Sequence, residues 1–476
     1  MIRLYNTPAR KAETFRPINE KEVLVYTCGP TVYSYQHIGN YTMYIYWDLL
    51  VRMLIESGYS VKRVLNITDV GHLVSDADEG EDKMQKGARR ESKTAQEIAN
   101  FYEKDFLENF RKLNLVEPTK IAEATKYIDE DLELVRILKD KGYTYQIDDG
   151  IYYDSSKFPR YSEFAHLNVE DLQAGARVEF NMQKRNVTDF ALWKFTQPNE
   201  RRDMQWITPA ELLDDPENER FGFPGWHIEC SAIIKKELGN TIDIHTGGID
   251  HIPIHHTNEI AQSEVANDAK LANYWLHGNF ITIDGRKISK SLGNTLTFED
   301  LDKNGFSHMD FKMWILQGHY QSERNFTYEN LAAAQNRLRS WKNTAALRHQ
   351  TNYVDGDAEL ISDSDKIMEA VSDNLNSPLA LSIIDEMLLK IQQDIAKISK
   401  ESITKFFERL DRLFGLNLID SSPDISYEAK NAIAERQEVR KNGDFEKSDG
   451  LRDVIESENG IVLKDTHDGT VWGYDA

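Results

Sequence analysis

One stretch, YTCGPTVYSYQHIGN at residues 26–40, constrains the fold more than any other part of the chain. The residues that lead into it, KEVLVYTC (21–28), are rich in β-branched and aromatic side chains. Nothing interrupts them before Gly29 and Pro30, so we predict a buried strand that ends at Cys28. The pattern after this turn is helical, and a strand, a turn and a helix in this order form the basic unit of an α/β sheet.

The helix after the turn is predicted from spacing. Apolar side chains recur three and four residues apart between Tyr44 and Ile55, and Gly39 and Asn40 stand where that pattern begins. In open α/β sheets, ligands bind at the carboxyl ends of strands, and a helix N-terminus offers free N–H groups and a positive dipole end to a phosphate. His37 and Asn40 would be additional donors there. The alternative is that they are a surface histidine and a helix-capping asparagine.

Charge and cysteine content exclude several classes of protein. The chain has 57 basic and 79 acidic residues, a formal charge of −22, which is unsuited to coating nucleic acid non-specifically. Only two cysteines occur among 476 residues, which suits a reducing compartment. No apolar run reaches the roughly 18 residues of a membrane span, and the N-terminus lacks a hydrophobic signal core. We therefore predict a cytoplasmic protein that binds neither a membrane nor DNA, and we expect a monomer.

The rest of the chain adds further helices and strands. Alternation of strand and helix patterns predicts an α/β fold, with a parallel sheet that is interrupted by an insertion and followed by a helical bundle. The predicted elements are a strand at 61–68, a charged helical region at 74–140, short strands within 141–222, a helix at 226–238, a strand at 241–250, a helix from about 255 and one further helix within 429–460.

Changes in composition set the boundaries between the predicted units. The units are residues 1–140 (first half of the sheet domain), 141–222 (inserted connective module), 223–280 (second half of the sheet domain), 281–330 (a region with a basic loop), 331–423 (helical bundle) and 424–476 (small terminal unit).

Four residues could together bind a metal ion: Cys28, Cys230, His255 and Glu259. His255 and Glu259 are four apart on a predicted helix and hence on one face, and Cys28 ends a strand. Two thiolates, an imidazole and a carboxylate suit Zn²⁺. Spacing leaves rival ligand sets open, because further histidines lie nearby, namely His227, His245, His251 and His256. The other interpretation is a pair of buried structural cysteines with hydrogen-bonded core histidines.

A basic loop forms the second candidate site. In RKISKSLGN (286–294), Lys287 and Lys290 are three apart, with Ser289 between them. Two ammonium groups on a glycine-containing loop suit a triphosphate, because lysine is a compact charge that can follow the phosphates as negative charge redistributes. A solvated basic loop is the alternative. The His-Ile-Gly-Asn helix start elsewhere in the chain favours the phosphate interpretation.

Together these motifs resemble a known family. HIGN at 37–40 and KISKS at 287–291 are similar to the two signature motifs of class I aminoacyl-tRNA synthetases. The surrounding sequence resembles the cysteinyl-tRNA synthetases within that class, over nearly the whole chain. The matching stretches are YTCGPTVY (26–33), LNITDVG (65–71), AGARVE (174–179), DFALWK (189–194), FPGWHIECSA (223–232), GGIDHIPIHHTNEIAQSE (247–264) and SDGLRDVIESENGIVLKDTHDGTVW (448–472).

The resemblance implies a fold and an activity. The fold is a Rossmann-type catalytic domain split by the insertion, then a stem-contact region, a helical bundle and a C-terminal anticodon-reading unit. The activity is the activation of L-cysteine with ATP and Mg²⁺, followed by transfer of the cysteinyl group to tRNA-Cys. One Zn²⁺ per subunit would select the substrate thiolate.

The resemblance also implies roles for individual residues. The implied zinc ligands are Cys28, Cys230, His255 and Glu259. The implied substrate-binding residues are Gly29, Thr68, Trp226 and Asp250, and Asp250 would meet the substrate ammonium. The implied ATP-binding residues are Pro30, Thr31, His37, Gly39, Asn40, Lys287, Ser289 and Lys290. The implied catalytic residues are His37, Asn40, Lys287 and Lys290.

Two stretches depart from the commoner family pattern. Asn40 replaces the second histidine of the first motif. In DHIPIHHTNE (250–259), Thr257 replaces a glutamate, and the residues directly before the histidine pair are not the usual aromatic and proline. Two other functions are alternatives to the synthetase. A cysteine ligase with an amino-sugar acceptor would lack the GTVW-containing tail that this chain has, and a catalytically silent paralogue that binds RNA or zinc would not need the retained lysines and metal-binding side chains.

Overall fold

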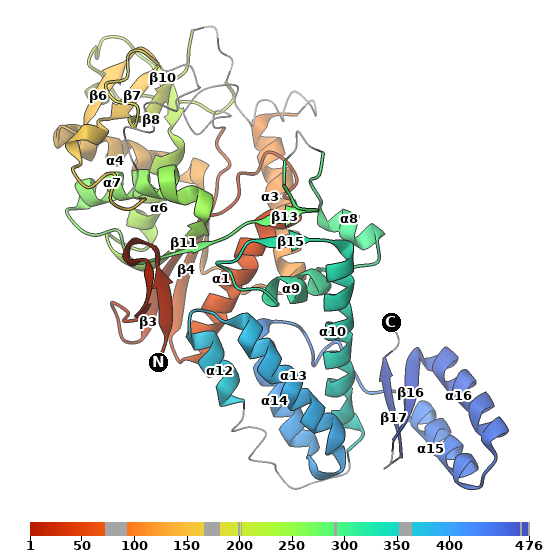
Figure 1. Ribbon diagram of the computed structural model, residues 1–476. Helices are drawn as coiled ribbons and strands as arrows, with labels where there is room; N and C mark the ends of the chain where they lie inside the picture. The colour runs from red at the N-terminus through yellow and green to blue at the C-terminus, as the bar shows by residue number, and fades with distance from the viewer. Residues whose placement is uncertain are drawn as a thin grey trace.

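The computed structural model describes residues 1–71, 93–165, 181–198, 200, 202–289, 293–351, 364–466 and 469–474. At its centre lies a parallel sheet of five strands in the order β12-β11-β3-β4-β5 (Figure 1). Its strands are β3 (Glu22–Thr27), β4 (Ser60–Ile67), β5 (Lys120–Glu123), β11 (Ile242–Gly248) and β12 (Ala272–Gly278). The chain runs from β3 outward to β5 and returns to the other side of β3 with β11. The strand order therefore reverses between β3 and β11, and in open α/β sheets ligands bind at such a point.

Helix α1 (Ile38–Glu56) connects β3 to β4 and confirms the predicted strand, turn and helix. Its sequence is apolar around most of its circumference, so the helix is buried on nearly every side. It contacts β4 as well as the later helices α9 (His308–Leu316) and α14 (Lys400–Phe414). This helix therefore joins the central sheet to the C-terminal half of the molecule.

Part of the predicted helical region at 74–140 is a strand, so the prediction was wrong there. Residues 72–92 lie outside the described residues, and α3 (Ala95–Lys112) and α4 (Ile128–Asp140) are helical as expected. Between them, β5 pairs in parallel with β4 and extends the sheet. Its sequence, KIAE, is too short to carry a strand pattern of its own, and pairing with β4 determines its conformation.

A second, antiparallel sheet lies between β5 and β11 in sequence, as the short strand signals predict. Its strands, in the spatial order β6-β7-β8-β10-β9, are β6 (Thr144–Ile147), β7 (Gly150–Tyr153), β8 (Phe190–Phe195), β9 (Trp206–Ile207) and β10 (Phe221–Pro224). Helices α4, α6 (Trp226–Glu237) and α7 (Thr257–Asn267) share a hydrophobic core with this sheet, and the group forms one end of the molecule (Figure 1).

A small sheet after β12 carries the basic loop. Strand β13 (Ile281–Ile283) pairs in parallel with β15 (Arg324–Phe326), and β14 (Arg286–Lys287) pairs antiparallel with β13. Between β14 and β15 lie α8 (Phe298–Lys303) and α9, whose N-terminal capping residues are Thr297 and Ser307. Each of these side chains accepts a hydrogen bond from the backbone of the first helical turn, which explains where the two helices start.

The helical part that follows is confirmed. It contains α10 (Tyr328–Ala346), α12 (Asp365–Ser372), α13 (Ser377–Gln393) and α14. Their buried side chains belong to the same hydrophobic cluster as those of α1. The bundle is therefore packed continuously onto the sheet domain rather than tethered to it.

The terminal unit contains two helices where the sequence predicted one. Helices α15 (Tyr427–Lys441) and α16 (Phe445–Asn459) are followed by a hairpin of β16 (Ile461–Thr466) and β17 (Gly469–Tyr474). The break falls at Gly443, whose φ of 82° suits glycine, and at Asp444, whose side chain accepts a hydrogen bond from Lys447 N at 3.1 Å. The single-helix prediction was wrong because these stop and start signals outweigh the surrounding helical pattern.

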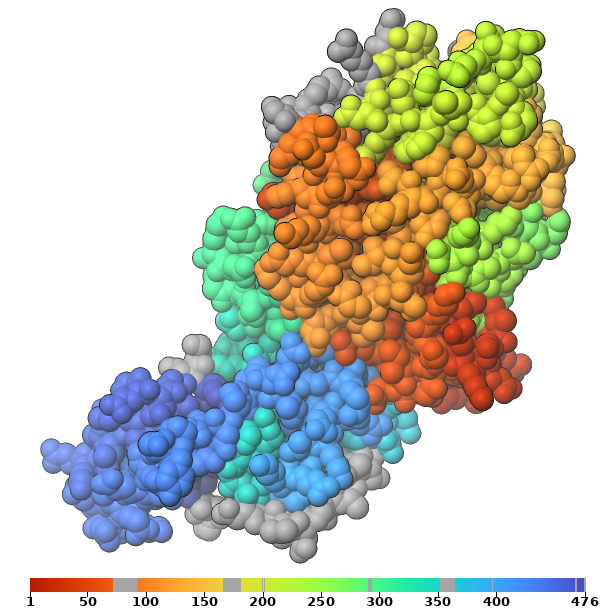
Figure 2. Space-filling model, turned by 180° about the vertical axis from the view of Figure 1, so that it is seen from behind, coloured from red at the N-terminus to blue at the C-terminus, as the bar shows by residue number. Residues whose placement is uncertain are grey.

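The molecule is elongated. Seen from behind in Figure 2, the inserted sheet and the C-terminal unit occupy opposite ends, and the bundle lies between the central sheet and the C-terminal unit. Among the described residues, no helix combines the length and apolar character needed to cross a bilayer.

Candidate active site

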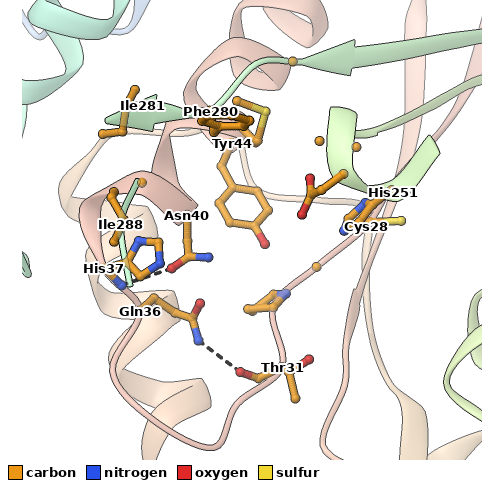
Figure 3. A pocket seen from close by; sticks show the side chains of 18 of the residues that line it. Cys28, Thr31, Gln36, His37, Asn40, Tyr44, His251, Phe280, Ile281 and Ile288 are labelled. Atoms are coloured by element: carbon orange, nitrogen blue, oxygen red, sulfur yellow. Dashed lines mark hydrogen bonds between the residues drawn. The ribbon is translucent and has the colours of Figure 1, made fainter. Parts of the chain in front are cut away.

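A cavity of about 490 Å³ opens at the point where the strand order reverses (Figure 3). One wall is the turn after β3, starting at Cys28, and a second is the turn after β11, ending at Asp250. The start of α1 and the segment around β13 and β14 form the others. The predicted site residues that line it are Cys28, Gly29, Pro30, Thr31, His37, Gly39, Asn40, Trp226, Asp250 and Lys287.

Two glycines allow the walls to approach each other. A Cβ atom on Gly29 would collide with the carbonyl oxygen of Asn66, so the turn after β3 can lie against β4 only because residue 29 has no side chain. A Cβ on Gly39 would lie 2.7 Å from Ile288 Cδ1. Gly39 thus lets the KISKS segment pack directly on the HIGN helix start, and the two motifs meet across the cavity.

The HIGN motif forms a cap at the start of α1. His37 N donates to Asn40 Oδ1 at 3.1 Å, and Ile38 N donates to Leu296 O at 2.8 Å. The capping alternative for Asn40 is therefore confirmed, but it does not remove either residue from the site. Both side chains still line the cavity beside the helix N-terminus (Figure 3).

Asn294 is bonded to the first part of the KISKS segment. Its side chain accepts a hydrogen bond from Ser289 N at 2.9 Å and donates one to Lys287 O at 3.1 Å. Lys287 is exposed and lines the cavity, whereas Ser289 does not line it. Lys290 lies outside the described residues, so its predicted place near the phosphates remains a prediction.

Thr68 does not reach the cavity, although the resemblance implied that it lines the amino-acid pocket. Its side chain is 2% exposed, donates to Glu229 Oε2 at 3.3 Å and accepts from Asn66 Nδ2 at 3.2 Å. Its backbone is joined to the turn after β3, since Val32 N donates to Thr68 O and Thr68 N donates to Pro30 O. Of the predicted substrate-binding residues, Gly29, Trp226 and Asp250 lie at the cavity wall.

Behind Cys28 lies a cluster of potential metal ligands. One ligand atom from each of Cys28, Cys230, His255 and Glu259 lies within 4.8 Å of all the others. His255 Nε2 lies 3.5 Å from Cys230 Sγ and 2.9 Å from Glu259 Oε1. Cys28 follows β3, Cys230 lies on α6, His255 lies in the π-helical turn Ile252–His256, and Glu259 lies on α7. Elements distant in sequence thus assemble the predicted ligand set.

A rival set is also assembled. Cys28, His245, His256 and Glu259 satisfy the same 4.8 Å limit. His245 Nε2 lies 2.7 Å from Glu259 Oε2, and His256 Nε2 lies 3.3 Å from Cys28 Sγ. His256 is in turn fixed by His277, whose Nε2 lies 2.7 Å from His256 Nδ1. The distances therefore do not decide between the two ligand sets, and neither did the spacing of the residues in the sequence.

The cluster favours a cation. A hydrogen bond from Cys28 and the nearby His255 lower the pKa of the Cys230 thiol to about 6, although burial opposes this. Burial would raise the pKa of Glu259, but His245 and His255 lower it to about 2. Burial likewise opposes the charging of His255, whose pKa Glu259 nevertheless raises to about 10. Near neutral pH the site therefore holds a thiolate, a carboxylate and a protonated His255, away from water. A divalent cation that displaces the His255 proton would supply the positive charge that the two anions need.

Sequence reasoning missed several residues that line the cavity. They include Gln36, Tyr44, Phe280 and Ile288. Tyr44 was assigned only to the apolar pattern of α1. The signal that could have placed it is its position four residues after Asn40, which puts both on one helix face.

Comparison with known proteins defines the class. The family described as tRNA synthetases class I (C) catalytic domain matches residues 14–336. The methionyl-tRNA synthetase of Mycobacterium tuberculosis, solved in complex with methionyl-adenylate, superposes with a TM-score of 0.58 at 15% identity, over 84% of this chain and 91% of that chain. The LeuRS of Agrobacterium radiobacter, in a ternary complex with tRNA and LeuAMS, gives 0.62 at 12% identity, over 86% and 85%. The fold is that of the class I aminoacyl-tRNA synthetases.

Relatives in sequence define the family within this class. A cysteine–tRNA ligase of Treponema denticola is 38% identical over 507 residues, covering 99% of this chain and 99% of the relative. Cysteine–tRNA ligase 1 of Burkholderia lata is 39% identical over 472 residues, covering 98% and 96%. The chain belongs to the cysteine–tRNA ligase family of class I aminoacyl-tRNA synthetases.

Proposed function

We propose that this ligase makes cysteinyl-tRNA-Cys in two steps within the cavity. A carboxylate oxygen of L-cysteine attacks the α-phosphorus of ATP, the bond to pyrophosphate breaks, and cysteinyl-adenylate forms. A ribose hydroxyl at the tRNA 3′ end then attacks the carbonyl carbon, and AMP leaves. No group of the protein needs to bond covalently to the substrate, so catalysis rests on positioning and charge stabilisation.

We propose Zn²⁺ as the metal and Cys28, Cys230, His255 and Glu259 as its ligands. A tetrahedral zinc with bonds of about 2.0–2.3 Å separates its ligand atoms by roughly 3.3–3.8 Å. The 3.5 Å between Cys230 Sγ and His255 Nε2 fits this spacing, and two thiols, an imidazole and a carboxylate are donors that zinc accepts. When bound, Zn²⁺ would supply a coordination position that a substrate thiolate fills and that a neutral hydroxyl or methyl fills poorly.

The amino-acid end of the cavity is assigned to Trp226 and Asp250. Asp250 follows β11 and lines the cavity, so its carboxylate can hold the substrate ammonium. The Trp226 ring lies 5.0 Å from that of His255, measured between centroids, which places the indole next to the ligand cluster. Gly29 belongs to this end because its lack of a side chain lets the turn after β3 lie against β4. Thr68 would support that turn through its backbone hydrogen bond with Val32.

The phosphate end is assigned to the two motifs. The side chains of His37 and Asn40, together with the positive end of the α1 dipole, would bind the phosphates of Mg²⁺-ATP. Gly39 lets Ile288 approach, so Lys287 reaches the same space, and Lys290 would follow it. Pro30 and Thr31 form the adjoining wall, and Ser289 is held by the hydrogen bond from its backbone N–H to Asn294. Compact ammonium charges would stabilise the negative charge that develops on the leaving pyrophosphate.

The remaining units would contact tRNA-Cys. The inserted sheet and the C-terminal unit lie at opposite ends of the elongated molecule (Figure 2), which suits contacts with the acceptor end and the anticodon respectively. We retain the predictions that the protein acts as a monomer in the cytoplasm, where both cysteine thiols would stay reduced.

The position of Cys28 is the observation that carries this proposal. Cys28 lines the cavity and also belongs to the ligand cluster, so a metal held there would face a bound amino acid. The test is transfer of labelled cysteine to total tRNA by the purified full chain with ATP and Mg²⁺. Label on one tRNA species, lost on chelation and restored by Zn²⁺, is expected. Cysteine-dependent pyrophosphate exchange without transfer would overturn the tRNA assignment, and activity that survives complete chelation would overturn the role of zinc.

A further inference from the structure

Tyr44 projects from α1 into the cavity. It lies one helical turn after Asn40 on the same face, and both residues line the cavity. In Figure 3 its ring extends inward from the helix, and its hydroxyl points into the space between His37 and Asn40 on one side and Cys28 and His251 on the other. The hydroxyl therefore occupies the middle of the site rather than either end.

The ring is held in place by aromatic side chains of α3. Its centroid lies 5.1 Å from that of Phe106 and 6.2 Å from that of Phe110, in edge-on geometry, and the side chain is 5% exposed. The hydroxyl itself makes no hydrogen bond to any residue in the described part of the chain. A fixed ring that presents an uncommitted hydroxyl to a cavity is prepared for a ligand rather than for packing.

We propose that the Tyr44 hydroxyl is a substrate-binding group that donates a hydrogen bond to the acyl-phosphate junction of cysteinyl-adenylate. This inference rests on the proposed function, because it takes the two ends of the cavity as assigned there. The amino acid lies against Cys28 and Asp250, and the phosphates lie against His37 and the start of α1. The group that joins them is the carboxyl carbon, its oxygens and the α-phosphate, and Tyr44 points at the space between the two ends.

The chemistry of the hydroxyl agrees with this role. Burial raises the pKa of Tyr44 well above its ordinary value. The group is therefore a neutral donor at every working pH and neither takes nor gives up a proton. Oxygens of the carboxylate and the α-phosphate carry negative charge, and hydrogen bonds to charged acceptors are stronger than those to neutral ones.

Asn40 complements this donor. Its carboxamide oxygen accepts from His37 N, so only its amino group can face a ligand. Helix α1 thus presents a neutral amide donor and a neutral hydroxyl donor one turn apart along a single face. The first is nearer the phosphates and the second nearer the amino acid, an order that matches the order of groups in an aminoacyl-adenylate.

The test compares Tyr44→Phe with Tyr41→Phe in the full-length, zinc-loaded protein. The first change removes only the proposed donor and keeps the ring against α3. Tyr41 lies on the same helix, packs against Phe298 and does not line the cavity. Cysteine-dependent ATP–pyrophosphate exchange should fall about 10- to 100-fold in kcat/KM for Tyr44→Phe and change less than threefold for Tyr41→Phe. The affinity for a non-hydrolysable sulfamoyl analogue of cysteinyl-adenylate should fall by a similar factor.

The outcomes separate this inference from the proposed function. If the wild-type protein shows no cysteine-dependent exchange, the proposed function fails. If it does, and Tyr44→Phe matches it in exchange and in analogue affinity, only the role of Tyr44 is overturned. Zinc content and thermal midpoint should stay unchanged in Tyr44→Phe, since a merely structural role would alter these first. Should that variant fold poorly, 3-fluorotyrosine at position 44 gives a second test: its fluorine resonance should shift when the analogue binds, and no shift would overturn the contact.

Discussion

Lys312 Nζ lies 3.0 Å from Asp48 Oδ2 in the interior of the protein, where α9 packs against α1. The side chains are 1% and 0% exposed. Lys312 also donates to Leu113 O at 3.0 Å and to Gly415 O at 3.3 Å, which follow the last turns of α3 and α14. One ammonium thus binds carbonyls at two helix C-termini, where the helix dipole favours a positive charge. It connects the sheet domain, α3 and the bundle.

Replacing Lys312 by Met should lower the free energy of unfolding by about 3–5 kcal/mol, because Asp48 would remain buried with only Arg52 as a charged partner. Lys303→Met is the matched control, since Lys303 is 65% exposed in its pair with Glu299 and should change stability by less than about 1 kcal/mol. Urea denaturation of the full chain measures both. Adding Asp48→Asn to Lys312→Met should recover part of the loss. Equal effects of the two methionine variants would contradict a structural role for the buried pair.

The central residues of the candidate active site could be predicted from the sequence, because they lie directly after the ends of strands. Cys28 and Asp250 lie after β3 and β11, and the Gly-Pro and Gly-Gly turns that mark these ends are visible in the sequence. The HIGN start of α1 could be placed for the same reason. Local signals sufficed here because each of these residues is positioned by its own turn and not by a distant partner.

The positions of other active-site residues depend on how elements distant in sequence pack together. Four histidines near the cysteines were equivalent by spacing, and their distances to Cys28 follow from how β11, α6 and α7 meet. The resemblance implied that Thr68 binds the substrate, but its side chain is buried and hydrogen-bonded to Asn66 and Glu229. The role of Tyr44 could not be predicted from its apolar pattern. Helical periodicity shows which residues lie on the same helix face, but not whether that face contacts the core or a cavity.

The two possible ligand sets make different predictions for metal binding. With Cys28, Cys230, His255 and Glu259 as ligands, Cys230→Ser should lower the affinity for zinc at least tenfold more than His256→Gln. His256 would then act only through its 3.3 Å contact with Cys28 Sγ, and changes at such supporting positions cost about 10- to 100-fold. Zinc per chain after dialysis against graded chelator measures this. The reverse order of the two variants would assign the metal to the set that includes His245 and His256.

Asp250 should determine the affinity for cysteine and not for ATP. Asp250→Asn keeps the size of the side chain and removes the charge that faces the substrate ammonium. The KM for cysteine in pyrophosphate exchange should rise about 10- to 100-fold, while the KM for ATP changes less than threefold. Asp214→Asn is the control, because Asp214 is 67% exposed on the inserted module. Equal increases in both KM values for Asp250→Asn would argue for a general distortion of the cavity.

His308 should make stability depend on pH. Its ring stacks on Phe298 with centroids 4.0 Å apart, and its Nε2 lies 2.8 Å from Asn109 Oδ1. Burial lowers the pKa of His308 to about 4, whereas an unfolded histidine titrates near 6.5. Between these values the unfolded chain binds the proton and the folded chain does not. Stability from this group is therefore complete above about pH 6.5 and is lost as the pH falls toward 4.

His308→Gln should remove this dependence, because glutamine can hydrogen-bond but does not titrate. Between pH 7.5 and 5, wild type should lose about 1–2 kcal/mol of unfolding free energy more than the variant. Urea denaturation of both proteins at the two pH values measures the difference, and the comparison cancels contributions from other titrating groups. His319→Gln offers a second comparison, because burial also lowers the pKa of His319, and each histidine should contribute its own separate loss. If wild type and His308→Gln lose the same stability, His308 becomes protonated in the folded state and its stacked, buried position does not hold it neutral.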